Sequence, residues 1–232
     1  MFVGVFDGHL GPGASEYASW SVPYCFVRSH LADVLPALRH AFLATDRALS
    51  ELATKYRLNC GTTAACCVVT DRHVFAANVG DSEAFLARRG GVVQLSYLHV
   101  ATDASEQERI VNQGGKIFNY QGKRVEGVMQ VTRSLGDQHF KRFIIPEPYT
   151  AEAALDGTEE FLLLATDGLF HVFAPADTIA LVRALLRGEP APILETHGIP
   201  APAAKEAIPD TLVALALRLG SSDNVSVVIV FF

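Results

Sequence analysis

The chain has 232 residues, of which half are hydrophobic and 19% are charged. This length suits one large domain or two small ones, and this composition predicts a packed core and excludes a wholly disordered chain. The formal net charge of −6 argues against nucleic acid as the main partner, because proteins that bind phosphate backbones carry a basic surface. A cluster of metal-binding acids would shift the charge in the same direction.

Four cysteines, Cys25, Cys60, Cys66 and Cys67, have no spacing that is typical of a zinc site. Cys66 and Cys67 are adjacent in an apolar segment, so we expect core thiols that face opposite sides of one strand. Unpaired thiols favour a reducing, intracellular location, in the cytoplasm or the nucleus. No apolar stretch is long enough to span a membrane, and the residues after Met1 do not resemble a signal peptide.

The first half of the chain predicts helices followed by a β meander. The expected elements are a buried strand over 2–6, the start of a helix over 13–20, a long helix over 33–56, and strands over 61–70, 74–79, 84–87 and 92–95. Asp33 is a candidate N-cap of the long helix, and Pro36 fits its first turn. Short strands joined by tight turns, such as Asp71-Arg72, are typical of antiparallel sheet.

The second half predicts further helices between apolar strands. The expected elements are a helix over 104–113, a polar loop over 120–126, a strand over 128–131, an irregular stretch over 132–148, a strand over 161–165, a helix over 175–187, a proline-rich loop over 189–202, a helix over 210–219 and a strand over 225–232. Meanders combined with long helices indicate the α+β class, in which sheets pack together and helices lie outside them.

Several apolar strands are directly adjacent to aspartates. The residues concerned are Asp7, which is followed by Gly8 and His9, then Asp81, Asp167 and Asp223. Buried carboxylates that lie close together repel one another unless a cation neutralises them, and hard divalent cations prefer oxygen ligands. If these strand ends converge, the sequence predicts a divalent metal site.

Each of these residues alone has a plainer interpretation. An Asp-Gly pair is usually a turn, and Asp223 alone would be a cap or turn residue. His9 alone would be an ordinary surface or core histidine. The full set, next to the most apolar strands, is what favours a site.

Six segments in order resemble the metal-dependent type 2C Ser/Thr protein phosphatases, the PPM family. They are Val5–His9, Gly61–Ala64, Ala77–Ser82, Val131–Asp137 with Pro146–Pro148 after it, Leu164–Phe170 and Gly220–Val227. The match covers nearly the whole chain. Each motif is weak by itself, but six in the same order are specific.

The resemblance implies a four-layer α/β/β/α sandwich of two antiparallel sheets flanked by helices. It implies one phosphatase-like domain over 1–232 that lacks the family's first strand. It also implies two Mg²⁺ or Mn²⁺ ions, with a weak third. By position, Asp7 would bridge the two ions, the Gly8 carbonyl would bind one of them, and Asp167 and Asp223 would bind the other.

Two further roles follow from the resemblance. Asp81 would belong to the weak third metal site, and His9 would be the general acid that protonates the leaving serine or threonine oxygen. The implied activity is the hydrolysis of phosphoserine and phosphothreonine in protein substrates, by a water that bridges the two cations. We expect a monomer that acts in signalling by dephosphorylation.

Other residues in these motifs are expected to have structural roles. They are Asn78, Thr62 and Thr63 near the sheet, and Thr132, Arg133 and Ser134 beside the cleft. The pair Lys141-Arg142 is expected to be solvated, since most exposed charge pairs are.

The chain departs from the family pattern in three places. Family members carry, upstream of the strand that contains Val5, an arginine that grips phosphate and an acidic pair, and this chain begins too late to contain them. His171 stands where the family usually has an acid of the third metal site, and Ser96–His99 lacks the expected Asp-His-Lys-Pro pattern. The alternative is therefore a catalytically impaired pseudophosphatase that acts as a binding or regulatory module.

Overall fold

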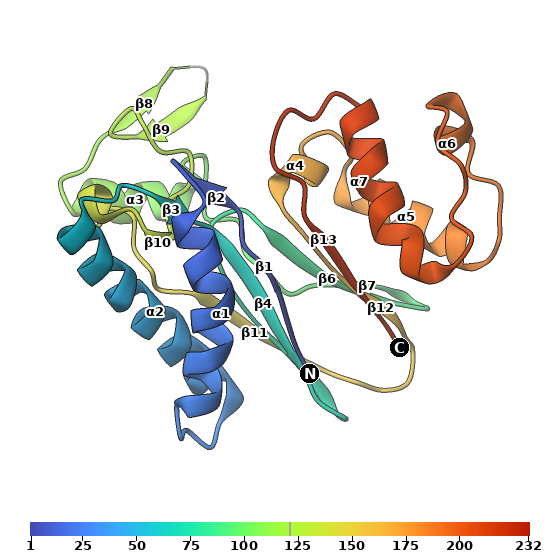
Figure 1. Ribbon diagram of the computed structural model, residues 1–232, viewed down its shortest axis with the longest axis horizontal. Helices are drawn as coiled ribbons and strands as arrows, with labels where there is room; N and C mark the ends of the chain where they lie inside the picture. Colours follow the sequence, from blue (N-terminus) through green and yellow to red (C-terminus); the bar gives the residue numbers. More distant parts are fainter. Residues whose placement is uncertain (121) are drawn as a thin grey trace.

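Two antiparallel sheets lie face to face in the computed structural model, which describes residues 1–120 and 122–232. Helices α1 (Gly13–Arg28) and α2 (Val34–Tyr56) lie outside one sheet, and α5 (Pro175–Leu186) and α7 (Ile208–Arg218) lie outside the other (Figure 1). This arrangement confirms the predicted α+β class and the four-layer sandwich.

The first sheet has the strand order β1-β4-β5-β11. Its strands are β1 (Phe2–Val5), β4 (Ala64–Val69), β5 (His73–Val79) and β11 (Tyr149–Ala154). Cys66 and Cys67 are both buried in β4, and they belong to different hydrophobic clusters. Cys66 packs with residues of α1 and α2, whereas Cys67 packs between the sheets. The prediction of two core thiols on opposite faces is therefore confirmed.

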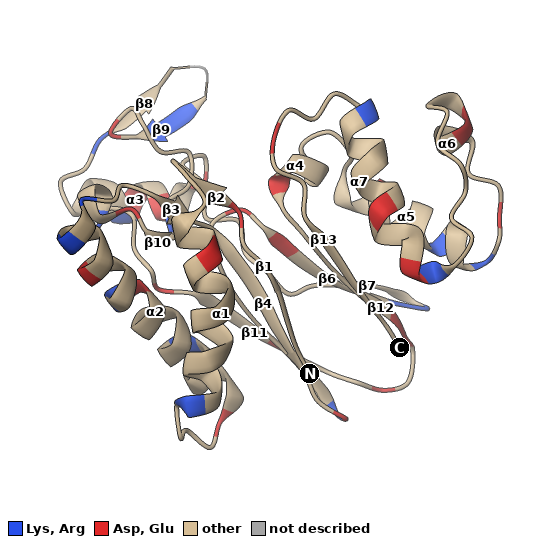
Figure 2. Ribbon diagram, in the orientation of Figure 1, with Lys and Arg blue, Asp and Glu red and all other residues tan. Residues whose placement is uncertain are grey.

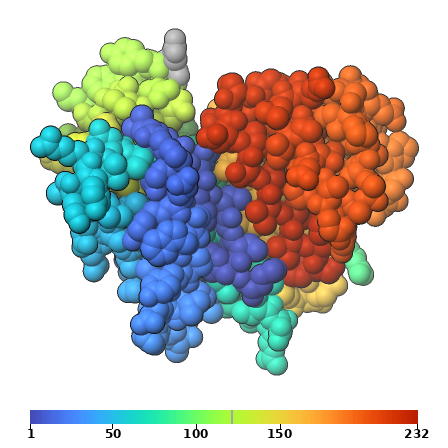
Figure 3. Space-filling view, viewed as in Figure 1, coloured from blue at the N-terminus to red at the C-terminus, as the bar shows by residue number. Residues whose placement is uncertain are grey.

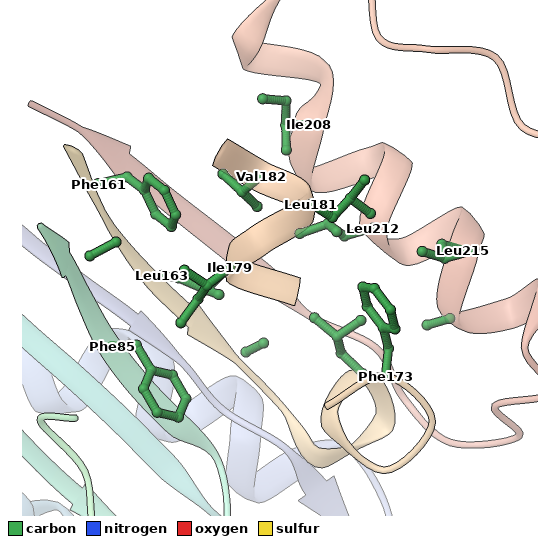
Figure 4. Packing of buried hydrophobic residues seen from close by; sticks show 14 of the residues in the cluster. Phe85, Phe161, Leu163, Phe173, Ile179, Leu181, Val182, Ile208, Leu212 and Leu215 are labelled. Carbon is green, nitrogen blue, oxygen red and sulfur yellow. The ribbon is translucent and has the colours of Figure 1, made fainter. Parts of the chain in front are cut away.

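The second sheet has the order β13-β12-β6-β7. Its strands are β13 (Val227–Phe231), β12 (Glu159–Ala165), β6 (Glu83–Arg88) and β7 (Gly91–Gln94). Figure 4 shows Phe161 and Leu163 of β12 packed towards Leu212 and Leu215 of α7. These four side chains are fully buried, so the helices and this sheet share one core.

Shorter elements complete the fold. They are β2 (Gly8–His9), β3 (Gly61–Thr62) and β10 (Leu135–Gly136), which form a small sheet, the hairpin β8 (Ile117–Asn119) and β9 (Lys123–Val125), helices α3 (Ala104–Asn112), α4 (Asp167–Phe170) and α6 (Pro192–Thr196), and 3₁₀ turns at Gln138–Phe140 and Lys205–Ala207. None of the helices in the described ranges combines the length and hydrophobicity that crossing a bilayer requires.

One strand prediction and one loop prediction are wrong. Residues 128–131 form turns and isolated bridges instead of a strand, and Met129 and Val131 are buried in a small cluster with Ile110 of α3. Their hydrophobicity therefore reflects packing against a helix and not a place in a sheet. The loop expected over 120–126 contains β9, while Gln121 lies outside the described residues.

The sequence did not predict some elements, and it predicted one helix too short. Strand β11 was not predicted, because it is an edge strand with little burial and no clear alternation. Helix α6 lies within the expected proline-rich loop. Helix α1 continues well beyond residue 20 and through Pro23. Asp33 does occupy the N-cap position of α2, but its side chain makes no capping hydrogen bond.

The packing of α7 predicts a large difference between two leucines. Leu212 is fully buried, so Leu212→Ala should lower the free energy of unfolding by about 2–5 kcal/mol, because it leaves a cavity. Leu217 on the same helix is 57% exposed, so Leu217→Ala should change it by less than about 0.5 kcal/mol. Urea denaturation of both variants measures this, and equal losses would contradict the described packing.

Candidate active site

The predicted site residues lie around one cavity of about 270 Å³. They are Asp7, Gly8, His9, Asp81, Asp167 and Asp223. The strands explain this convergence: β1 and β12 end just before Asp7 and Asp167, β5 ends just before Asp81, and β13 begins shortly after Asp223. Figure 3 shows a hollow between the blue-to-green and the orange-to-red parts of the surface. The structure thus brings all six residues together, and their individual roles stay predictions.

Three aspartates of this cavity have pKa values above the ordinary value of an aspartate. Burial, followed by repulsion from Asp167 and Asp223, raises the pKa of Asp7 to about 7. Burial and the Asp167 charge likewise raise the pKa of Asp81 to about 7, and burial with the Asp223 charge raises that of Asp167. Figure 2 shows acidic positions, in red, on β6 and at the start of α4, where Asp167 lies. Without a cation, Asp7 and Asp81 therefore keep their protons to a higher pH than ordinary aspartates do.

The chemistry of these donors fits Mg²⁺ or Mn²⁺, since both cations prefer carboxylate and carbonyl oxygens. The raised pKa values of Asp7 and Asp81 are what a nearby positive charge would lower. As they stand, however, no three His, Cys, Asp or Glu side chains in the described part of the chain are arranged to hold an ion. The donor set fits a divalent cation, and the side chains would need to draw together around it.

His9 is held by a buried acid that the sequence did not single out. Its Nε2 lies 2.8 Å from both carboxylate oxygens of Asp137, which is only 2% exposed. The Ser134 hydroxyl donates to the same carboxylate. Burial lowers the pKa of His9, but the hydrogen bond and charge of Asp137 outweigh burial, so the pKa lies above its usual value.

Asp137 reaches His9 because of an unusual backbone and an adjacent glycine. Its φ of 50° lies in the left-handed region. A Cβ placed on Gly61 would lie only 2.2 Å from the Asp137 Oδ2, so only glycine fits there. The backbone N–H of Gly136 donates to Asp46 of α2 at 2.9 Å, which fixes the turn from the other side.

The threonines of the second motif fix the backbone of Asp7. The Thr62 hydroxyl donates to the Asp7 carbonyl at 3.0 Å, and the Thr63 N–H donates to it at 2.9 Å. Asn78 accepts from the Tyr97 N–H and donates to the Tyr97 carbonyl. These contacts agree with the structural roles that the sequence predicted.

Residues within and after the fourth motif also make structural contacts. Arg133 donates to Glu106 at 2.6 Å and to the Glu147 carbonyl at 2.9 Å, so its guanidinium ties α3 to the long loop. The prediction of a solvated pair is wrong for Lys141, whose Nζ lies 2.5 Å from Asp46 and whose side chain is 18% exposed. A buried carboxylate on α2 attracts this lysine.

The sequence missed two residues near the cavity. Asp137 ends a motif, but nothing local indicates that it contacts a histidine 128 positions away. Arg124 of β9 lines the cavity, and its Nη1 donates to the Val128 carbonyl at 2.7 Å. His171, at the position of the family's acid, is 80% exposed on its side chain, and its Nδ1 lies 3.9 Å from Asp167.

A family model described as "Protein phosphatase 2C" matches residues 1–225. The chain therefore belongs to the protein phosphatase 2C family, a family of serine/threonine protein phosphatases, as its motifs predicted.

Relatives and solved structures agree with this assignment. Protein phosphatase 2C homolog 1 of Saccharomyces cerevisiae is 35% identical over 99% of this chain and 81% of its own length. Mouse protein phosphatase 1E is 34% identical over 99% of this chain, but the chain spans only 29% of that relative. A solved structure of a C. elegans sex determining protein has a TM-score of 0.87 and 29% identity, and covers 99% of this chain and 56% of its own.

The fold is shared more widely than the sequence. The crystal structure of a serine-threonine phosphatase 2C from Toxoplasma gondii has a TM-score of 0.79 at 20% identity, over 100% of this chain and 84% of that one. The four-layer arrangement of this chain is therefore the fold of these phosphatase structures.

The raised pKa of Asp7 predicts that the carboxylate costs stability in the metal-free protein. The folded pKa of about 7 exceeds the ordinary value of 3.8, so the unfolded state binds fewer protons between these values. Stability therefore falls as pH rises through this window, and the loss is complete above pH 7. With EDTA present, Asp7→Asn should stabilise the protein by about 1 kcal/mol at pH 8, after allowance for solvent screening, and by less at pH 5.

Chemical denaturation at the two pH values measures this effect. Asp71, an exposed aspartate in the β4–β5 turn, provides the control Asp71→Asn, which should change stability little at either pH. A variant of Asp7 that is destabilised at pH 8 in EDTA would show that its carboxylate is not repelled by its neighbours.

Proposed function

We propose that this chain hydrolyses phosphoserine and phosphothreonine in proteins and requires Mg²⁺ or Mn²⁺ to do so. The observation that carries the proposal is the convergence of four aspartates and His9 on one cavity, in a chain of the protein phosphatase 2C family. Carboxylates around one cavity repel a phosphate dianion and one another, so substrate binding needs cations in the same place.

The proposed cation site follows the positions of the donors. Two ions would be held by Asp7 between them, by the Gly8 carbonyl, and by Asp167 and Asp223, with Asp81 at a weaker third position. When bound, the cations would activate the water that attacks phosphorus and offset the charge of the phosphoryl oxygens. The hydrogen bonds from Thr62 and Thr63 to the Asp7 carbonyl orient that strand end before any ion binds.

His9 is proposed to donate the proton to the leaving oxygen. Its Nε2 is engaged by Asp137, which leaves Nδ1 as the nitrogen that can face the substrate. The Asp137 carboxylate stabilises the protonated imidazole, and burial keeps that carboxylate from turning towards solvent. In this proposal Asp137 positions His9 and does not contact the substrate.

The setting of the activity is also proposed. Residues 1–232 would act as one phosphatase domain, because both sheets contribute to a core that they share. We also propose that this domain acts as a monomer. The free cysteines of the chain fit a location in the cytoplasm or the nucleus, and dephosphorylation of a signalling protein fits the family.

A second candidate function is that of a pseudophosphatase. It is favoured by the lack, in the described residues, of three acidic or histidine side chains already arranged for an ion, and by His171 at the position of an acid. In this case the same cavity would bind a partner or a phosphoprotein without hydrolysing it.

Metal-dependent turnover decides between the two candidates. We expect hydrolysis of a phosphothreonine peptide that increases with added Mn²⁺ and is abolished by EDTA. Asp167→Asn should lower kcat/KM by about 100-fold or more, since it removes a carboxylate that interacts with the ions. The matched control is Asp177→Asn, which changes an exposed aspartate in the first turn of α5. Absence of Mn²⁺-dependent turnover in the folded protein would leave the pseudophosphatase.

The role of His9 predicts a dependence on the leaving group. His9→Ala should slow the hydrolysis of phenyl phosphate, whose phenolate is a poor leaving group, by about 10²–10⁴-fold. It should slow p-nitrophenyl phosphate much less, because nitrophenolate leaves without a proton. Asp137→Asn should show the same pattern in milder form. Equal slowing of both substrates by His9→Ala would exclude the role of proton donor.

A further inference from the structure

A second groove lies on the outer side of the first sheet and its helices. It has a volume of about 560 Å³ and runs between α2 and the strand β11. We call it the α2 groove, and define it by Leu31, Leu35, Arg39, Leu43, Arg47 and Thr150. It shares no lining residue with the cavity that contains the aspartates.

The spacing of the lining residues makes the groove alternate between apolar and basic. Leu35, Arg39, Leu43 and Arg47 follow one another at intervals of four, so they form one row along α2. Leu35 and Leu43 are half-buried, whereas Arg39 and Arg47 are exposed. A partner would therefore meet apolar and cationic side chains in turn.

The charge of the groove is opposite to that of the chain. The chain carries 25 acidic and 19 basic residues, yet the groove is lined by Arg39, His40 and Arg47 and, among the described residues, by no Asp or Glu. Arg39 donates two hydrogen bonds to the carboxylate of Glu147, and a carboxylate of a partner would take the place of Glu147. Arg47 makes no ion pair with any residue of the described ranges.

The far wall of the groove is an open sheet edge. Strand β11 is the last strand of the first sheet and pairs only with β5, where Thr150 lies opposite Ala77. Edge strands leave backbone N–H and C=O groups to which an extended segment can add. The row from Leu35 to Arg47 spans about 18 Å at 1.5 Å per residue, which matches about five residues of an extended strand.

We propose that the α2 groove binds an extended acidic segment of a partner protein, in which leucine-like side chains and glutamate or aspartate follow one another at every second position. This spacing places them all on the face towards α2. The leucines would pack on Leu35 and Leu43, and the carboxylates would pair with Arg39 and Arg47. The backbone of the segment would pair with the outer edge of β11. This docking site does not depend on catalysis in the other cavity.

Fluorescence polarisation with a labelled peptide of the repeat Leu-Ser-Glu-Ser, which places leucine and glutamate on one face of an extended strand, tests the proposal. The wild-type chain should bind it, and Arg47→Glu should weaken binding by about tenfold or more, because attraction becomes repulsion. Arg218→Glu changes an equally exposed helical arginine of α7, in the other helix layer, and should leave binding unchanged. No binding by the wild-type chain, or equal weakening by both variants, would overturn the proposal.

Two further peptides separate specific docking from simple charge attraction. Replacing each leucine of the probe by serine keeps the charge and should abolish binding, whereas equal binding would overturn the proposed apolar contacts. Replacing each glutamate by lysine should abolish binding to the wild-type chain and restore it with Arg39→Glu/Arg47→Glu. Light scattering adds a last criterion: a dimer that Arg47→Glu dissociates would make a second copy the occupant, and would overturn the proposal of an acidic partner.

Discussion

The repulsion among half-buried carboxylates is the constraint on which the site depends. Asp7, Asp81 and Asp167 follow the ends of three different strands, and their charges oppose the closure of the sandwich at this end. The fold compensates with backbone contacts that do not depend on these charges, such as those from Thr62 and Thr63 to the Asp7 carbonyl. The core between the sheets supplies the stability that the site itself lacks.

The sequence predicts the fold best where burial is most uniform. Residues 161–165 are apolar throughout because β12 lies inside both a sheet and a sandwich, and such a run is easily recognised. Strand β11 and the hairpin of β8 and β9 lie at edges, where one side faces solvent or a loop, so their residues show no marked pattern. The hydrophobic residues of 128–131 led to a wrong strand prediction, because they are buried against a helix and do not belong to a sheet.

The candidate site also contains residues that the sequence could identify and residues that it could not. The aspartates could be found from the sequence because each is adjacent to an apolar strand, and strand ends in a sandwich meet at its edge. Asp137 could not be found in this manner, because its contact with His9 joins residues far apart in the chain and requires a left-handed turn. Likewise, the sequence predicts a solvated Lys141, because its ion-pair partner, Asp46, belongs to a distant helix.

The lack of a side chain at Gly61 has a consequence for natural sequence variants of this protein. It has no part in binding or proton transfer, yet any side chain at this position would displace the carboxylate that holds His9. The surrounding strands β3 and β10 pair through backbone atoms alone, so the fold could persist around such a change. Gly61 is thus a position at which one inherited substitution would break the contact between Asp137 and His9 while the fold and every acidic residue remained in place. Under the role proposed for His9, the product of such a gene would be a weakened enzyme.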